Sequence, residues 1–226
     1  MRPVTFATVL WEANDSSFEF SKCYDDSWVD KLYRGFARNY DGPFRFVCYT
    51  DRLRDFAEDV IQRPLVWEGK PDYSCCIQPF AESLHSPMIL CGLDTIITGD
   101  MTPLVEYVKN RWNQLALPLD PLESVLRRRV FCNGGRVFCN GVCLVPMGNE
   151  LIYLDHNGEN DMDWLNGFDP VAIDEKFPGQ VLSYKGHILK RAKNGEGLGD
   201  ARMIYFHGDQ KPHELLHLSW VKDNWY

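Results

Sequence analysis

An acidic residue interrupts an apolar stretch in the first half of the chain. Residues Met88–Thr98 read MILCGLDTIIT, and Asp94 is the single charged residue among them. A carboxylate placed where a buried strand emerges costs desolvation free energy unless a cation meets it. A divalent metal ion holding a diphosphate would be such a cation, because hard cations prefer oxygen ligands. A helix cap or a surface ion pair would also explain Asp94, so the spacing alone leaves both interpretations open.

A second polar cluster follows an apolar run near the C-terminal end, where residues Ile204–Pro212 read IYFHGDQKP. His207 can ligate a metal through a neutral ring nitrogen, and Gly208 allows the backbone to approach a ligand closely. Lys211 supplies a compact positive charge that suits a phosphate group. Ligands of open α/β sheets gather beyond the carboxyl ends of the strands. We therefore expect this cluster and Asp94 to belong to a ligand site.

The elements that must position these residues begin with a β-α-β unit. Residues Val4–Leu10 are rich in β-branched side chains and predict a buried strand. Apolar residues within Asp26–Tyr40 follow helical spacing, and Phe44–Thr50 predicts a second strand. A right-handed crossover makes two such strands parallel. The pattern predicts an α/β fold with a doubly wound sheet.

The remaining elements are predicted from weaker local signals. Met88–Cys91 is expected to form a strand that continues as Asp94–Thr98 after a break at Gly92. Thr102 is the expected N-cap of a helix with Pro103 at its first position. The sequence VFCNG occurs twice, at residues 130–134 and 137–141, and suggests a hairpin. Further predicted elements are helices at Ser74–Leu84, Leu119–Arg129 and His213–Trp225, a strand at Met203–Phe206 and a loop at Lys193–Asp200.

Composition limits the class of protein that is expected and its expected location in the cell. The 226 residues are 45% hydrophobic and 25% charged, and we expect one domain over residues 1–226. A formal net charge of −8 disfavours broad attraction to nucleic acid or anionic membrane, although Arg127–Arg129 forms a local basic patch. No apolar stretch reaches the ~20 residues of a membrane span, and no signal peptide is evident. We expect a cytoplasmic protein of a bacterial or phage-infected cell, with its eight cysteines reduced and mostly in the core.

The order of the motifs along the chain resembles the GT-A fold glycosyltransferases. The resemblance is to the family 8-like, glycogenin-related group and its small bacterial and phage relatives, in which a strand ends in Asp-x-Asp. It implies a single-domain GT-A fold with a Rossmann-like, mostly parallel central sheet flanked by helices. The segments that carry the resemblance are residues 88–103 (MILCGLDTIITGDMTP), Cys139–Val142, Val181–Lys185 and His207–Pro212.

The resemblance also implies a reaction, in which a sugar passes from a nucleotide-diphosphate donor, most plausibly a UDP-sugar, to an acceptor hydroxyl with retention of configuration. Asp94 and His207 would bind Mn²⁺ or Mg²⁺, and Lys211 would bind the diphosphate. The implied catalytic residues are Asp94, Lys211, Asp161 and Asn140. The implied donor-binding residues are Leu10, Trp11, Asp51, Gly92, Leu93, Gly208, Lys211 and Asp163.

Three positions depart from the pattern of that group. The first Asp of Asp-x-Asp falls on Gly92, a common Lys falls on Cys76, and the Gln of an Asp-Gln pair falls on Met162. The metal site is therefore expected to be weakened, because one carboxylate ligand is lost. An active enzyme with fewer ligands and a nucleotide-sugar binding protein without catalysis both remain open. The acceptor also stays open, between a glycan, a protein and a modified base in phage DNA.

Overall fold

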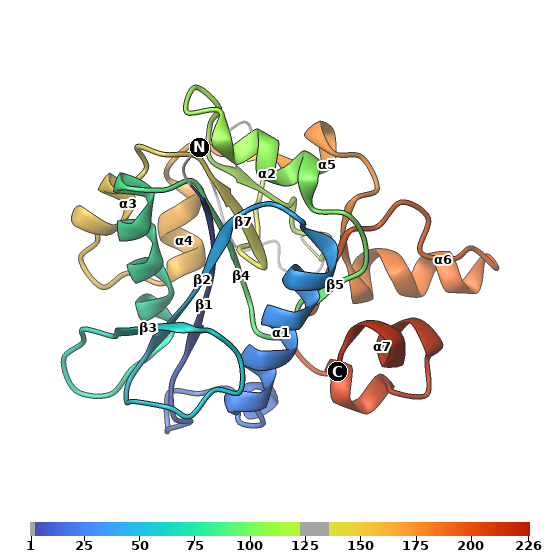
Figure 1. Ribbon diagram of the computed structural model, residues 1–226, viewed down its shortest axis with the longest axis horizontal. Helices are drawn as coiled ribbons and strands as arrows, with labels where there is room; N and C mark the ends of the chain where they lie inside the picture. Colours follow the sequence, from blue (N-terminus) through green and yellow to red (C-terminus); the bar gives the residue numbers. More distant parts are fainter. Residues whose placement is uncertain (1–2, 123–135) are drawn as a thin grey trace.

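A computed structural model describes residues 3–122 and 136–226, and its N-terminal unit matches the sequence prediction (Figure 1). Strand β1 spans Val4–Leu10, helix α1 spans Asp26–Asn39, and β2 spans Phe44–Thr50. The two strands pair in parallel over their whole length, from Val4 opposite Phe44 to Leu10 opposite Thr50. The side chain of Asp25 caps α1 by accepting a hydrogen bond from the Ser27 amide. The predicted β-α-β unit is confirmed.

The central sheet has seven strands in the order β3-β2-β1-β4-β7-β6-β8. Pairs β1–β2, β1–β4, β2–β3 and β6–β8 are parallel, and β7 runs antiparallel to both β4 and β6. The predicted α/β class with a mostly parallel central sheet is thus confirmed. The other strands are β3 (Ile61–Pro64), β4 (Met88–Cys91), β6 (Ala116–Leu117), β7 (Val142–Val145) and β8 (Val171–Ala172).

Helices cover both faces of this sheet, so its strands alternate between two apolar cores (Figure 1). Phe6 packs with α1, whereas the next residue, Ala7, packs in the opposite core with Ile77 and Phe80 of the 3₁₀-helix η2 (Tyr73–Leu84). Along β4, Ile89 belongs to the first core, and Met88 and Leu90 belong to the second. Burial on both faces explains why these strands read as continuous apolar runs.

A smaller sheet corrects one sequence prediction. It joins β5 (Ile96–Ile97), β10 (Met203–Tyr205) and β9 (Val181–Ser183), with β10 in the middle. The segment at Asp94–Thr98 is therefore not a continuation of β4. After Cys91 the chain makes a turn, closed by the Thr95 amide donating to the Gly92 carbonyl at 3.1 Å, and then enters the second sheet.

The helix predicted at Ser74–Leu84 is confirmed as a 3₁₀-helix, whereas other helix predictions need correction. Element η2 (Tyr73–Leu84) is a 3₁₀-helix with Pro79 inside it, a residue that lacks the amide hydrogen an α-helix would use. Thr102 is the first residue of α2 rather than its cap, and its amide donates to the Asp100 carboxylate instead. The remaining helices are η1 (Glu19–Ser21), α2 (Thr102–Lys109), α3 (Leu151–Leu154), α4 (Asp161–Asn166), α5 (Ile173–Lys176), the π-helix η4 (Tyr184–Ile188) and α6 (Leu189–Lys193).

The predicted helix at His213–Trp225 is two short helices, η5 (Pro212–Leu215) and α7 (Ser219–Asn224), because Leu218 between them is extended. Leu119 lies in an isolated bridge with Phe138 rather than in a helix. Residues 120–122 form a turn, in which the Leu122 amide donates to the Asp120 carboxylate. The part of this predicted helix from residue 123 to Arg129, with Arg127–Arg129, and the first VFCNG copy lie outside the described residues.

Two further expectations from the sequence concern reduced cysteines and the absence of a membrane span. The seven cysteines in the described part of the chain are free thiols, and five of them are buried. Cys132 lies outside the described residues. Among those residues, no helix combines the length and the apolar character that crossing a membrane requires.

Candidate functional site

A cavity of about 260 Å³ opens at the carboxyl ends of β1 and β4 and beside the end of β10. This is the edge of the sheet at which the sequence predicted a ligand site. Ten of the predicted site residues line it, namely Leu10, Trp11, Gly92, Leu93, Asp94, Asn140, Asp161, His207, Gly208 and Lys211. Asp51 and Asp163 are not among its lining residues.

A buried ion pair joins the two sequence motifs inside this cavity. The Lys211 ammonium donates a close hydrogen bond to Asp94 Oδ2, and the Tyr24 hydroxyl donates to the same oxygen at 2.7 Å. The side chains of Lys211 and Asp94 are 4% and 9% exposed. Burial, and then the charge of Asp94, raises the pKa of Tyr24 far above its usual value, so Tyr24 remains a hydrogen-bond donor. The sequence motifs gave no signal for Tyr24.

The same ammonium is covered by aromatic rings from the segment that precedes α1. Lys211 Nζ lies 4.8 Å from the centre of the Phe20 ring and 5.5 Å from that of Tyr24. Contacts of this kind stabilise a cation electrostatically. Lys211 is therefore held in place from two sides, by a carboxylate and by aromatic faces.

The side chains that would hold a metal ion are engaged with other partners. Asp94 Oδ2 accepts two hydrogen bonds, and His207 Nε2 lies 2.6 Å from Ser183 Oγ. A Cβ atom at Gly92 would lie 3.0 Å from Asp94 Oδ1, which shows where the missing carboxylate would stand. No group of three or more His, Cys, Asp or Glu side chains suited to a metal occurs among residues 3–122 and 136–226. The donor set does not fit a dedicated metal centre as it is arranged, and the Mn²⁺ or Mg²⁺ site stays a prediction from the sequence.

His207 follows β10 and is in its neutral form at pH 7. Burial is the main cause of its lowered pKa, which the carboxylates of Asp120 and Asp94 oppose. Lys185 and Lys211 lower the pKa of His207 further. Charged groups of both signs thus surround this imidazole.

Asn140 and Asp161 form a second polar pair in the cavity. Asn140 Nδ2 donates to Asp161 Oδ2 at 2.5 Å, and the Met162 amide donates to Asp161 Oδ1 at 2.8 Å. The Cys76 thiol donates to the same carboxylate, so the position where a Lys was expected carries a weak neutral donor. Burial outweighs these hydrogen bonds and raises the pKa of Asp161 to about 6. Asp163, which lies two residues after Asp161 on α4, is exposed.

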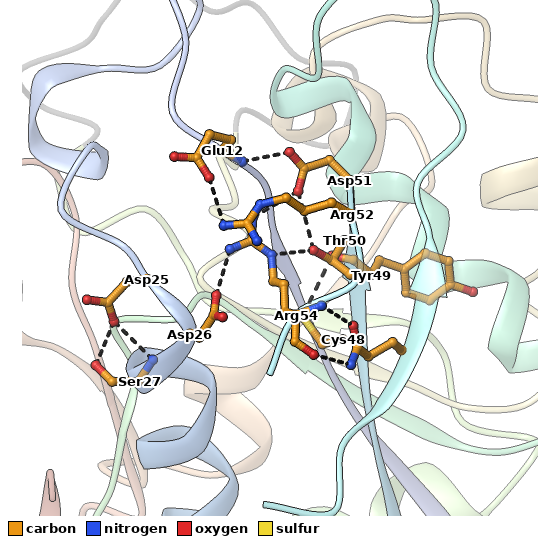
Figure 2. Close-up of polar contacts among 11 residues, drawn as sticks. Glu12, Asp25, Asp26, Ser27, Cys48, Tyr49, Thr50, Asp51, Arg52 and Arg54 are labelled. Carbon is orange, nitrogen blue, oxygen red and sulfur yellow. Dashed lines mark hydrogen bonds and ion pairs between the residues drawn. The ribbon is translucent and has the colours of Figure 1, made fainter. Parts of the chain in front are cut away.

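Asp51 belongs to a network of polar contacts (Figure 2) and is not a lining residue of the cavity. Its carboxylate accepts from the Glu12 amide at 2.9 Å and from Arg54 Nη2 at 2.8 Å. Burial alone would raise the pKa of Asp51, but these hydrogen bonds outweigh it and lower the pKa. Asp51 therefore fixes Glu12, which follows directly after the cavity residues Leu10 and Trp11 at the end of β1.

Arg54 is the centre of this network, and the sequence analysis missed it. Its guanidinium side chain is only 2% exposed and also donates to Asp26 Oδ1 at 2.7 Å and to Thr50 Oγ1 at 2.6 Å (Figure 2). Two carboxylates and a hydroxyl satisfy it, as a buried charge requires.

Gly141 lies where the cavity wall meets a buried aromatic ring, and we predict that Gly141→Ala destabilises the fold. The new Cβ would lie 2.5 Å from Cδ2 of Tyr205, a fully buried side chain. Overpacking of this kind costs about 1–3 kcal/mol. The free energy of unfolding in urea measures the loss, with Gly197→Ala, which has open space around it, as the control. Equal urea midpoints for Gly141→Ala and Gly197→Ala would contradict the prediction that a side chain at residue 141 overpacks against Tyr205.

Comparisons with known proteins connect this geometry to one class of enzyme fold. No family model and no curated protein matches the sequence. The galactosyltransferase LgtC, solved with donor and acceptor sugar analogues, superposes with a TM-score of 0.59 at 12% identity over 97% of this chain and 96% of its own. The glycosyltransferase GlyE of Streptococcus pneumoniae TIGR4 gives a TM-score of 0.57 at 16% identity, over 99% of this chain and 61% of its own.

The bifunctional glycosyltransferase WbbM gives a TM-score of 0.55 at 9% identity over 93% of this chain, which spans 46% of the WbbM chain. Identities this low show the fold alone. The chain has the GT-A glycosyltransferase fold that the sequence predicted. Membership of the family 8-like group stays a prediction.

Proposed function

We propose that the protein is a glycosyltransferase that takes a sugar from a nucleotide-diphosphate donor. The observation that carries the proposal is the cavity at the carboxyl ends of β1 and β4, which is lined by the buried Lys211 and by the hydrogen-bonded pair of Asn140 and the buried Asp161. LgtC, which has the same fold, was solved with donor and acceptor sugar analogues. A UDP-sugar is the donor that the motif resemblance favours.

Donor recognition is assigned to the two sides of this cavity. Leu10 and Trp11 would contact the base and ribose, and Gly208 and Lys211 would contact the diphosphate. When the bond between sugar and diphosphate breaks, negative charge develops on the leaving oxygen. A preorganised cation stabilises that charge best, because it needs no reorganisation during the reaction. Asp94 and Tyr24 hold Lys211 in such an orientation.

Asn140 and Asp161 would face the transferred sugar, and retention of configuration is expected from the resemblance. The Mn²⁺ or Mg²⁺ ion that the resemblance implies would need Asp94 and His207 as ligands, and both side chains would first have to exchange their present partners. The acceptor is a glycan, a protein or a modified DNA base. The net charge of −8 argues against DNA, and a steep fall in transfer with added salt would reverse that judgement.

A binding protein without catalysis is the second candidate. It is favoured by Cys76, whose neutral thiol contacts Asp161 where a charged lysine was expected, and by the absence of a side chain at Gly92. Such a protein would bind a nucleotide sugar without releasing its sugar.

Thermal stabilisation by nucleotides tests both candidates. We expect UDP and one or more UDP-sugars, at ~100 times their Kd, to raise Tm by about 5–10 °C, because a ligand of the folded state stabilises by mass action. The panel includes GDP, ADP and their sugars, each with Mn²⁺ and with EDTA. Release of UDP from the donor, with or without an acceptor, then separates an enzyme from a binding protein. No shift with any nucleotide would refute both candidates.

A further inference from the structure

Two neighbouring strands of the small sheet deliver polar residues to one place. Strands β9 and β10 are parallel, and Ser183 pairs with Tyr205. Lys185 and His207 each follow two residues after a member of that pair, so the register carries both beyond the same sheet edge. Ser183 Oγ lies 2.6 Å from His207 Nε2 and accepts from the Gly186 amide at 2.9 Å. The turn that carries Lys185 is thereby fixed to His207.

The ammonium of Lys185 lies against Gly208 at the wall of the cavity. A Cβ atom placed on Gly208 would be 3.4 Å from Lys185 Nζ, with no other heavy atom beyond the chain neighbours of Gly208 within 4 Å. Gly208 has a φ of +59° and itself lines the cavity. A side chain there would stand beside the ammonium and would also strain the backbone. Lys185 is not itself a lining residue, but Gly208 places no side chain between its ammonium and the cavity.

Lys185 is also an uncompensated cation. Across residues 3–122 and 136–226 it has no ion-pair or hydrogen-bond partner, whereas Lys211 is paired with Asp94. Of the two ammonium groups, that of Lys211 is neutralised by a carboxylate, whereas that of Lys185 is free, among the described residues, to meet an anion.

We propose that Lys185 is the second diphosphate-binding cation of this site, and that with Lys211 it allows the donor to bind without a divalent metal ion. The inference rests on the proposed function, since it concerns the donor of that reaction. The observations that support it are separate from those that support the proposed function. The carboxylate that a metal would need at residue 92 is missing, Asp94 is engaged by Lys211, and a free lysine lies beside Gly208. A lysine ammonium is a suitable point charge for phosphate.

The affinity for UDP, measured by titration calorimetry, tests this proposal. We expect wild-type protein to bind UDP with the same Kd in EDTA and in millimolar Mn²⁺. Lys185→Gln should raise that Kd at least about tenfold, because a charge-assisted hydrogen bond to phosphate is lost. Lys185→Arg should restore it to within a few-fold. Lys193→Gln, which removes the same charge from an exposed position on α6, should leave the Kd unchanged.

Other outcomes separate this inference from the proposed function. UDP binding by wild-type protein that requires Mn²⁺, or equal affinity of Lys185→Gln and wild type, would overturn the two-lysine site and leave the glycosyltransferase proposal standing. Absence of binding by UDP and every other nucleotide diphosphate would overturn both. Far-ultraviolet circular dichroism checks that each variant is folded. We expect this for Lys185→Gln, because the Lys185 side chain is half-buried and has no polar partner within the described part of the chain.

Discussion

Asp94→Asn is expected to lower the rate of sugar transfer by at least about 100-fold, comparable to the loss of one preorganised electrostatic contact in other enzymes. Asp94 is the anion that orients the Lys211 ammonium, and Tyr24 donates to the same oxygen. An amide oxygen still accepts hydrogen bonds, but it carries no charge to hold the lysine. The same loss of rate is expected if Asp94 ligates a metal ion. The prediction therefore tests whether Asp94 is needed for transfer, whether it acts on Lys211 or on a metal ion. Steady-state transfer at saturating donor measures it, with the exposed Asp223→Asn as the control.

The stability of this variant must be separated from its activity. Removing one member of a buried ion pair costs about 3–5 kcal/mol, because the remaining charge stays buried without a partner. The double variant Asp94→Asn with Lys211→Met removes both charges. We expect it to unfold at higher urea than Asp94→Asn alone and to remain inactive. Wild-type turnover in a folded Asp94→Asn protein would refute the assignment.

The fold could be predicted from the sequence where one local pattern determines one element. Strands β1 and β2 have the predicted bounds, because a continuous apolar run can be buried on both faces of a sheet. Predictions failed where the backbone depends on distant contacts. Residues after Cys91 look like more of the same strand, but they pair with Met203 and Ile204 in a second sheet. Nothing in the local sequence of β5 shows whether it continues β4 or pairs with β10 in the second sheet.

The candidate site could likewise be predicted where it depends on local motifs, but not where it depends on distant contacts. The residues Asp94, His207 and Lys211 were found because they lie in recognisable motifs, and all three line the cavity. Their partners were not found. The ion pair between Asp94 and Lys211 joins residues 117 positions apart, and Tyr24 is 70 positions from Asp94. Arg54 was not predicted because a buried arginine has no sequence pattern of its own. Asp51 is only three residues away, but the fold brings Asp26 beside Arg54 from 28 positions away.

Asp161 gives the second large prediction, which concerns pH. Burial raises its pKa from 3.8 to about 6, although Asn140 and the Met162 amide donate to it. The charged and titratable groups that face it are the thiols of Cys76 and Cys143 and the carboxylate of Asp163. An ionised carboxylate stabilises the positive charge that develops on a sugar as its bond to the diphosphate breaks.

We therefore expect kcat/KM of wild-type protein to rise through an apparent pKa of about 6 as Asp161 loses its proton. Asp161→Asn should lack that step and transfer sugar at least about 100-fold more slowly at pH 8. The pKa of His207 is also lowered from its usual value of 6.5, so the wild-type profile alone does not identify the group. A step near pH 6 that persists in Asp161→Asn would assign it to His207 and contradict the prediction.

Stability supplies an independent measurement of the same carboxyl group. Its pKa is higher in the folded state than in the unfolded chain, so the unfolded chain releases this proton first as pH rises. The contribution of Asp161 to stability is full below pH 3.8 and is lost by about pH 6, a fall of ~3 kcal/mol. Urea unfolding of wild type and Asp161→Asn between pH 4 and 7 should show this fall in wild type alone. Parallel curves would mean that the folded protein holds Asp161 as an ordinary carboxylate, and the kinetic step would then need another source.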